Sequence, residues 1–247
     1  MQTKLIFLLF TSGLCKDLEP CNQVEDEILC KSNEDYRLDY PPDPWPAMIQ
    51  PVVRIQEIIE VNENKQSLTI LMKVIQEWID PTLNVKNPQD VWYKVPKSAK
   101  LERYDFWFPI LYFNKALSIR KVSTLGKDKI HDFWFKATEK RLWYSEDLEV
   151  TFACEMNFAD FPIDKHICNF TFGDNEMTKS RIVYNQSVIE HDFENISNYG
   201  QVLKIKDTTT PFNFKISLLK PFYGRSVGYI EPFSFTGMMI EMRRKGT

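Results

Sequence analysis

The chain has 247 residues, with 31 Lys and Arg against 34 Asp and Glu, which gives a formal net charge of −3. This balance argues against a nucleic-acid partner, because phosphate binding needs a concentrated basic face. The 43% of hydrophobic residues can fill a core, and the 8 Gly and 14 Pro suit many bounded strands better than a glycine-rich nucleotide fold.

The first residues have the pattern of a secretory signal peptide. Lys4 gives a charged start, residues 5–10 are apolar, and residues 11–13 are small enough for cleavage. The apolar run is far shorter than the about 20 residues that a membrane span needs. We therefore predict a signal peptide over residues 1–15 and one extracellular domain over residues 16–247. An exposed N-terminal strand is the alternative for the first segment.

A signal peptide implies an oxidising compartment, in which the 5 Cys are expected to form disulfides. Cleavage after Cys15 leaves four cysteines, whereas cleavage two residues earlier leaves Cys15 unpaired. The simplest pairing of the four is local and joins Cys21 to Cys30 and Cys154 to Cys168. Three glycosylation sequons, which agree with secretion, begin at Asn169, Asn185 and Asn195.

Residues 20–35 are polar and acidic and are compatible with a helix. Nine residues along one straight helix span roughly 13 Å, whereas a disulfide tolerates a Cα separation of only about 7 Å. A helix here must therefore be short or broken if Cys21 bonds Cys30. The Pro-rich residues 40–46 follow and predict a stiff, extended segment.

The remainder of the chain has the pattern of β-strands. Residues 68–78 and 148–158 alternate apolar and polar side chains, with the period of two that is typical of half-buried strands. The Phe-rich residues 212–216 and 233–236 continue the pattern near the C-terminus. Because no long helical pattern separates these runs, we predict an antiparallel sandwich or barrel in a single domain.

Four stretches form an ordered set of motifs. They are V-N-E-N-K-Q at 61–66 followed by W-I-D-P-T-L at 78–83, W-F-P at 107–109 followed by Asn114, F-P-I-D at 161–164 between Cys154 and Cys168, and R-R-K at 243–245. The set resembles the extracellular domain of the Cys-loop (pentameric ligand-gated) receptors. One departure is Ile110, which stands where the W-x-P-D motif of that family has an Asp.

The resemblance implies an all-β fold, a ten-strand antiparallel immunoglobulin-like β-sandwich with a short N-terminal helix. It also implies a homopentamer, or a hetero-pentamer with related subunits, that binds an unknown small molecule between neighbouring subunits. A transmembrane domain, absent from this sequence, would hold the protein at the extracellular face of the plasma membrane, and this fragment alone would be secreted. A naturally soluble pentamer resembling the acetylcholine-binding proteins is the alternative.

The resemblance also assigns a ligand site with an unusual composition. Its candidate residues are Lys73, Ile75, Phe113, Asn175, Phe222, Tyr223 and Tyr229. Lys73 and Asn175 stand where the family has aromatic residues, which contribute about 0.5–2 kcal/mol each to binding a cation. Ile75 replaces an arginine that would bind a carboxylate. Ordinary packing for the aromatic residues, and a solvated strand position for Lys73, are the alternatives.

A second set of residues resembles the apparatus that couples binding to gating. Phe161 and Pro162 would form the apolar tip of a loop that faces the membrane domain. Glu63 and Arg244 resemble an acid and a base that pair between the two domains, with two unrelated surface charges as the alternative. Asp164 is expected to shape the loop through backbone hydrogen bonds rather than to contact the ligand.

An enzyme is the third class of function and is disfavoured. The chain has 3 His, and the adjacent pairs His131-Asp132 and His191-Asp192 would point to opposite faces of a strand and form no dyad. The sequence contains no H-E-x-x-H, G-x-S-x-G or C-x-x-C pattern. We therefore predict no catalytic residue, no cofactor and no metal site.

Overall fold

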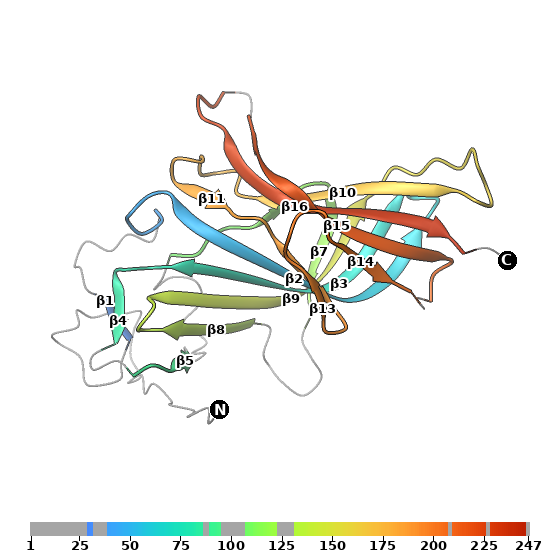
Figure 1. The fold of residues 1–247 in the computed structure, drawn as a ribbon. Coiled ribbons are helices and arrows are strands. Elements are labelled where there is room, and N and C mark those ends of the chain that lie inside the picture. Colours follow the sequence, from blue (N-terminus) through green and yellow to red (C-terminus); the bar gives the residue numbers. More distant parts are fainter. Residues whose placement is uncertain are drawn as a thin grey trace.

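The computed structural model describes residues 29–31, 39–85, 89–94, 107–122, 131–206, 209–225 and 228–245 (Figure 1). These residues form strands and no helix, which confirms the predicted all-β class. Of residues 20–35, the segment expected to hold a short helix, Leu29–Lys31 form a strand and the rest lies outside the described residues. The predicted signal peptide and Cys21 lie outside them as well.

The described residues form sixteen strand segments, more than the ten expected, because several are short pieces of two to four residues. Their bounds are β1 Leu29–Lys31, β2 Ala47–Asn62, β3 Ser67–Ile79, β4 Leu83–Val85, β5 Trp92–Lys94, β6 Tyr112–Phe113, β7 Ala116–Lys121, β8 His131–Lys136, β9 Arg141–Ala153, β10 Lys165–Gly173, β11 Ile182–Tyr184, β12 Val188–His191, β13 Glu194–Ile196, β14 Val202–Ile205, β15 Phe212–Gly224 and β16 Phe233–Arg244.

Two large sheets pack face to face as a sandwich (Figure 1). One has five strands in the order β14-β15-β16-β10-β6. The other has nine, in the order β13-β12-β2-β3-β9-β8-β5, with β11 beside β2 and β7 beside β9. The pairing is antiparallel as predicted except at β11 and β12, which run parallel to β2. A separate two-stranded ladder joins β1 to β4.

The alternating pattern of β3 and β9 fills the core from one side. The two strands pair without a break from Ser67 opposite Ala153 to Ile79 opposite Arg141. Their inward residues, such as Ile70, are fully buried against side chains of β10, β15 and β16 in one cluster. Fully burying a side chain of this size contributes roughly 1.5–3 kcal/mol. The alternating pattern predicted a strand up to residue 158, but β9 ends at Ala153. Cys154 and Met156 nevertheless stay buried.

A second cluster surrounds Trp78 near the far end of β3. Its ring lies 6.3 Å from the ring of Trp107 in an edge-to-face arrangement and 6.3 Å from the ring of Phe133 in a stacked one. Aromatic pairs of this kind are stabilising beyond the area that they bury. The W-F-P motif is therefore fixed to the nine-stranded sheet by its tryptophan.

The hairpin of β15 and β16 carries one irregularity. Its pairing runs in register from Phe212 opposite Arg244 to Leu219 opposite Gly237, and then shifts before Phe222 pairs with Phe235. Beyond this shift the two strands extend to the tip between residues 224 and 233. Figure 1 shows this tip projecting away from the sandwich, while the end of β16, the start of β10 and the turn between β2 and β3 gather at another end.

Candidate functional site

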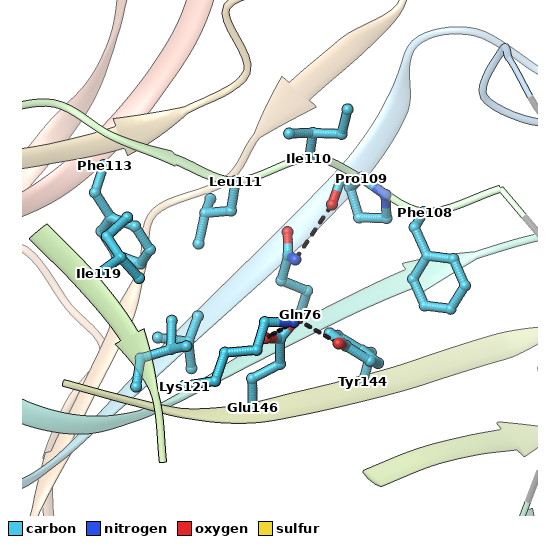
Figure 2. Close-up of a pocket in the computed structure, with 12 residues that line it drawn as sticks. Gln76, Phe108, Pro109, Ile110, Leu111, Phe113, Ile119, Lys121, Tyr144 and Glu146 are labelled. Carbon is cyan, nitrogen blue, oxygen red and sulfur yellow. Dashed lines mark hydrogen bonds and ion pairs between the residues drawn. The ribbon is translucent and has the colours of Figure 1, made fainter. Parts of the chain in front are cut away.

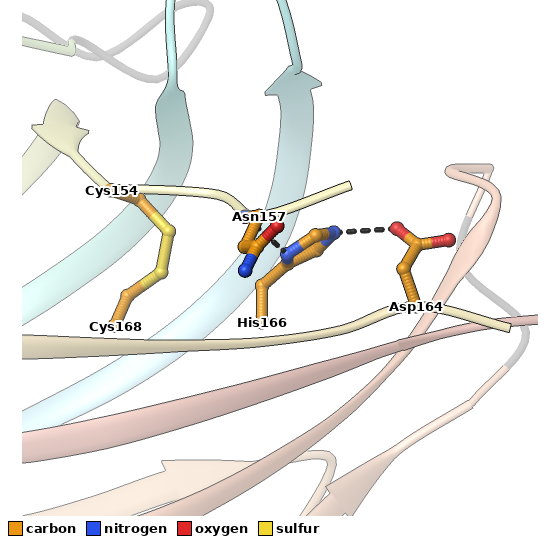
Figure 3. The surroundings of a disulfide bond; sticks show 5 residues. All are labelled: Cys154, Asn157, Asp164, His166 and Cys168. Carbon is orange, nitrogen blue, oxygen red and sulfur yellow. Dashed lines mark hydrogen bonds and ion pairs between the residues drawn. A yellow bond between two sulfur atoms is a disulfide. The ribbon is translucent and has the colours of Figure 1, made fainter. Parts of the chain in front are cut away.

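The loop between β9 and β10 is closed by a disulfide between Cys154 and Cys168 (Figure 3). Their Cα atoms lie 5.3 Å apart and both residues are buried. Between them, the chain turns at Phe161 and Pro162, whose peptide bond is cis. Phe161 and Ile163 are 63% and 79% exposed, so the loop presents an apolar tip to solvent.

Arg244, at the end of β16, binds this loop through two hydrogen bonds to one carboxylate. Its Nε and Nη2 donate to the two oxygens of Asp164 at 2.6 and 3.0 Å. The backbone amide of Arg244 also donates to the carbonyl of Asp164 at 3.2 Å. A planar guanidinium that meets a carboxylate in this bidentate manner is both strong and directional.

Arg244 also reaches the turn between β2 and β3, where Nη1 donates to Glu63 Oε1 at 3.0 Å. The guanidinium carbon lies 4.9 Å from the centre of the Phe161 ring and 4.6 Å from that of Phe212. One side chain therefore joins three segments, namely the β2–β3 turn, the disulfide-closed loop and the end of the last strand.

His166 completes the group, and sequence reasoning assigned it no role. Its Nε2 lies 2.6 Å from Asp164 Oδ2, and the backbone N–H of Asn157 donates to its Nδ1 at 3.3 Å (Figure 3). Because Nδ1 accepts, the proton of the neutral ring sits on Nε2 and is donated to Asp164. We call Glu63, Asp164, His166 and Arg244 the Arg244 cluster.

Contacts within the Arg244 cluster shift the pKa of Asp164 and of Arg244. The hydrogen bonds from Arg244, with smaller contributions from His166 and the residue's own backbone amide, lower the pKa of Asp164 from 3.8 to about 2 despite its burial. The bonds to Asp164 and Glu63 raise the pKa of Arg244. Asp164 was expected to shape the loop through backbone hydrogen bonds, but its carboxylate binds chiefly the side chains of Arg244 and His166.

Of the two candidate ligand residues of β3, Lys73 is partly exposed and Ile75 is buried. Lys73 Nζ donates to Asp147 Oδ2 of the neighbouring strand β9 at 3.1 Å, so its charge already has a partner. Ile75 is 4% exposed and pairs with Val52 and Ser145 inside the nine-stranded sheet. Both residues belong to that sheet.

Three other candidates lie on the β15–β16 hairpin. Phe222 stacks on Phe235 with ring centres 5.5 Å apart, and Tyr229 meets Phe233 edge to face at 4.8 Å. Tyr223 is 57% exposed, and the ammonium of Lys179 lies 5.3 Å from its ring centre. Two half-exposed tyrosines therefore lie at this end of the hairpin, and Lys179, from the segment between β10 and β11, approaches one of them.

Asn175 and Phe113 lie beside the five-stranded sheet. Asn175 is exposed in the bend that follows β10. Phe113, in β6, is partly buried between Phe152 and Phe172, with ring centres 6.0 and 5.8 Å away. Within one chain, the seven candidates thus occur in two groups, one on each sheet.

The segment around Ile110, where the family pattern has an Asp, is held by its backbone instead. The hydroxyl of Tyr184 donates to the carbonyl of Ile110 at 2.8 Å, and Gln76 Nε2 donates to the carbonyl of Pro109 at 3.3 Å (Figure 2). Tyr184 is fully buried, and this burial raises its pKa well above the ordinary value. These two hydrogen bonds hold the segment in place, although Ile110 lacks the carboxylate of the family's Asp.

The remaining site predictions have mixed outcomes. Asn169 and Asn195 are exposed, and Asn185 is partly exposed, but glycosylation stays a prediction at all three. The expectation that His191 and Asp192 point apart is wrong, because Asp192 lies in a turn at φ 45° and its carboxylate is 3.0 Å from His191 Nε2. The Cys21–Cys30 pairing stays a prediction because Cys21 lies outside the described residues.

Comparison with known proteins decides the family. A sequence model described as "Neurotransmitter-gated ion-channel ligand binding domain" matches residues 26–216. The chain belongs to this family. The resemblance inferred from the motifs is therefore confirmed, and since members of this family are parts of ion channels, the chain is not expected to catalyse a reaction.

By their names, three relatives of this ligand-binding domain are a channel subunit, a receptor-like protein and a receptor subunit. It is 26% identical over 144 residues to the proton-gated ion channel subunit pbo-6 of Caenorhabditis elegans, and the matched region covers 55% of this chain and 30% of that protein. It is 26% identical over 140 residues to a gamma-aminobutyric acid receptor alpha-like protein of Drosophila melanogaster, with 56% and 19% covered. It is 23% identical over 181 residues to the gamma-aminobutyric acid receptor subunit alpha-4 of Rattus norvegicus, with 69% and 32% covered.

The ligand-binding domain spans between about a fifth and a third of the length of these relatives. Among its described residues, no helix is both long enough and apolar enough to cross a membrane.

Proposed function

We propose that this chain is the extracellular ligand-binding domain of a pentameric ion channel. It binds a small ligand where neighbouring subunits meet and passes the change to the pore, which the channel's membrane domain supplies. The domain stands on the extracellular face of the plasma membrane. Its family membership and the names of its relatives support the class of protein, and the Arg244 cluster supports the route to the pore.

The observation that carries the proposal is the set of contacts around Arg244. The β2–β3 turn, the disulfide-closed loop and the end of β16 are far apart in sequence, since Glu63 and Arg244 are separated by 181 positions. A single, partly buried ion-pair network holds them together at one end of the sandwich, next to the exposed apolar tip at Phe161. A movement of one of these segments would therefore be passed to the other two.

The ligand site divides between two subunits under this proposal. The β15–β16 tip with Tyr223 and Tyr229 forms one wall, and strand β3 of the neighbouring subunit forms the other. Lys73, already paired with Asp147, gives that second wall little net charge, and Ile75 is buried. The site therefore favours a ligand held by the aromatic tip and by hydrogen bonds over one held by a carboxylate–arginine pair.

The test uses the full-length channel, challenged in oocytes with acidic pH and with gamma-aminobutyric acid, the two agonists in the names of the relatives. Arg244→Gln removes the ion pairs with Glu63 and Asp164, and we expect a shift of at least tenfold in the half-maximal agonist concentration with normal surface expression. Arg54→Gln is the matched control, because Arg54 forms an exposed pair with Glu190 at 2.7 Å. An unaltered Arg244→Gln response would refute the coupling route.

A further inference from the structure

The outward face of the five-stranded sheet carries a group of cationic side chains. Side chains alternate between the two faces of a strand, and on β14, β15, β16 and β10 the inward ones, such as Ile216 and Ile240, are buried in the core. The residues between them therefore point away from the core. Four of these outward residues are exposed cations, which we call the basic face: Lys165, Lys204, Lys215 and Arg243.

The register of the strands brings these cations together, although they come from four strands that lie side by side (Figure 1). Lys165 pairs with Arg243 across β10 and β16, and Lys204 pairs with Lys215 across β14 and β15. Arg243 also pairs with Asn213, two positions before Lys215 on β15. The two pairs of cations therefore occupy neighbouring rows of the sheet, at the end that carries the Arg244 cluster.

This arrangement is unfavourable for the fold, because like charges placed directly opposite each other on two strands destabilise a sheet. Glu241 compensates in part, since it lies 2.9 Å from Lys165 Nζ and 3.9 Å from Lys215 Nζ. It is the only acid in β10, β14, β15 and β16, all of which the structure describes. An excess of positive charge thus remains on this face of a chain whose net charge is −3.

The shape of the basic face favours an extended partner. Neighbouring strands lie about 4.8 Å apart, so the cations extend over about 14 Å from β10 to β14. A single small anion would reach only one of the two rows. A linear polymer with repeated anionic groups would contact both rows at once, and Lys and Arg bind sulfate-like oxyanions through charge-assisted hydrogen bonds.

The compartment narrows the class of polymer. Under the proposed function this face lies outside the cell, where nucleic acids are not the usual polyanions. Anionic lipids give their negative surface potential to the cytoplasmic leaflet of the membrane. Sulfated polysaccharides of the cell surface and the matrix are the polyanions of the extracellular space, and clusters of Lys and Arg are typical of the surfaces that bind them.

We propose that the basic face binds a linear sulfated polysaccharide of the heparan sulfate type. The inference rests on the extracellular position in the proposed function, but on neither its ligand site nor its coupling route. The basic face lies at the Arg244 end of β16, whereas Tyr223 and Tyr229 lie at the opposite end of the hairpin. The polysaccharide therefore leaves the proposed ligand site open.

The test measures binding of this chain to immobilised heparin by surface plasmon resonance at about 0.15 M salt. Chemically desulfated heparin and vesicles that contain phosphatidylserine are the comparison surfaces. The double variant Lys204→Gln and Lys215→Gln removes two exposed cations of the basic face. The matched control is Arg54→Gln with Arg120→Gln, which removes two exposed cations of the nine-stranded sheet. Glu241→Gln removes the one acid of the basic face.

We expect the wild type to bind heparin and not its desulfated form. The Lys204 and Lys215 double variant should bind about five- to thirtyfold more weakly, the effect of two exposed charge contacts, with its urea unfolding transition retained. The control should change binding by less than about twofold, because salt screens distant charges. Glu241→Gln should strengthen binding, because it removes a repulsive charge.

Four results would each overturn the proposal. They are a wild type that does not bind heparin, equal binding of the desulfated polymer, an equal loss in the two double variants, and tighter binding to the vesicles than to heparin. Weaker binding of Glu241→Gln would likewise contradict the assignment of the contact to this face.

Discussion

Asp164→Asn is the most informative single substitution, because it keeps the size of a fully buried side chain and removes its charge. In the wild type, Asp164 accepts from two guanidinium nitrogens of Arg244 and from His166. The asparagine turns an NH₂ group toward one of these donors, so at least one charge-assisted hydrogen bond is lost. We expect the free energy of unfolding to fall.

The size of the effect follows from the pKa of Asp164, which falls from 3.8 to about 2 on folding. Each unit corresponds to 1.36 kcal/mol, so the charged carboxylate contributes about 2 kcal/mol at neutral pH. This value agrees with the about 1.5–3 kcal/mol measured for hydrogen bonds to charged groups.

The same shift fixes the pH dependence. A carboxylate whose pKa is lower in the folded state stabilises fully above its unfolded value and loses that stabilisation as the pH falls toward its folded value. Urea unfolding of both proteins between about pH 7 and pH 2 should therefore show the difference at its full size above pH 3.8 and most of it gone near pH 2. A difference that stays constant across this range would refute the assignment of the effect to the charge of Asp164.

Three further predictions concern the scaffold, each measured by urea unfolding. The double variant Cys154→Ser and Cys168→Ser should lose about 3 kcal/mol, because the disulfide closes a loop of about 15 residues; an equally stable variant would contradict this. Tyr184→Phe should lose about 1–3 kcal/mol, since the carbonyl of Ile110 is left without its donor, and a change near zero would show that water replaces the hydroxyl. Gly237→Ala should lose about 3 kcal/mol or more, because its Cβ would collide with the backbone of β10, and wild-type stability would show that β10 can move aside.

The strands were predictable because burial on one face of a sheet imposes a period of two on the sequence. The end of β9 was not, because Cys154 and Met156 keep that period after the pairing with β3 has ended at Ala153. Burial alone therefore mimics a strand. The parallel pairing of β11 and β12 with β2 depends on contacts across more than 130 positions, which local patterns do not contain.

The Arg244 cluster was only partly predictable. The contact of Glu63 with Arg244 came from resemblance, since no local signal links positions so far apart in sequence. The role of His166 had a usable signal, because a spacing of two at the start of a strand places it on the same face as Asp164. On the ligand side, the sequence revealed that Lys73 and Ile75 are unusual, but not that Asp147 pairs with one and that the sheet buries the other.

Strand β16 connects the two ends of the domain that matter for its proposed function. Its 12 residues extend over about 40 Å, from beside the tyrosine-bearing tip to Arg244. From Gly237 to Arg244 its ladder with β15 has no register shift, whereas the pairing shifts between Leu219 and Phe222, on the side of the tip. Under the proposed function, we expect a ligand that only bends the tip to deform the chain at this shift and to leave Arg244 in place. A ligand that draws the tip along the axis of β16 is expected to move Arg244, so the direction of the movement would distinguish an agonist from a silent ligand.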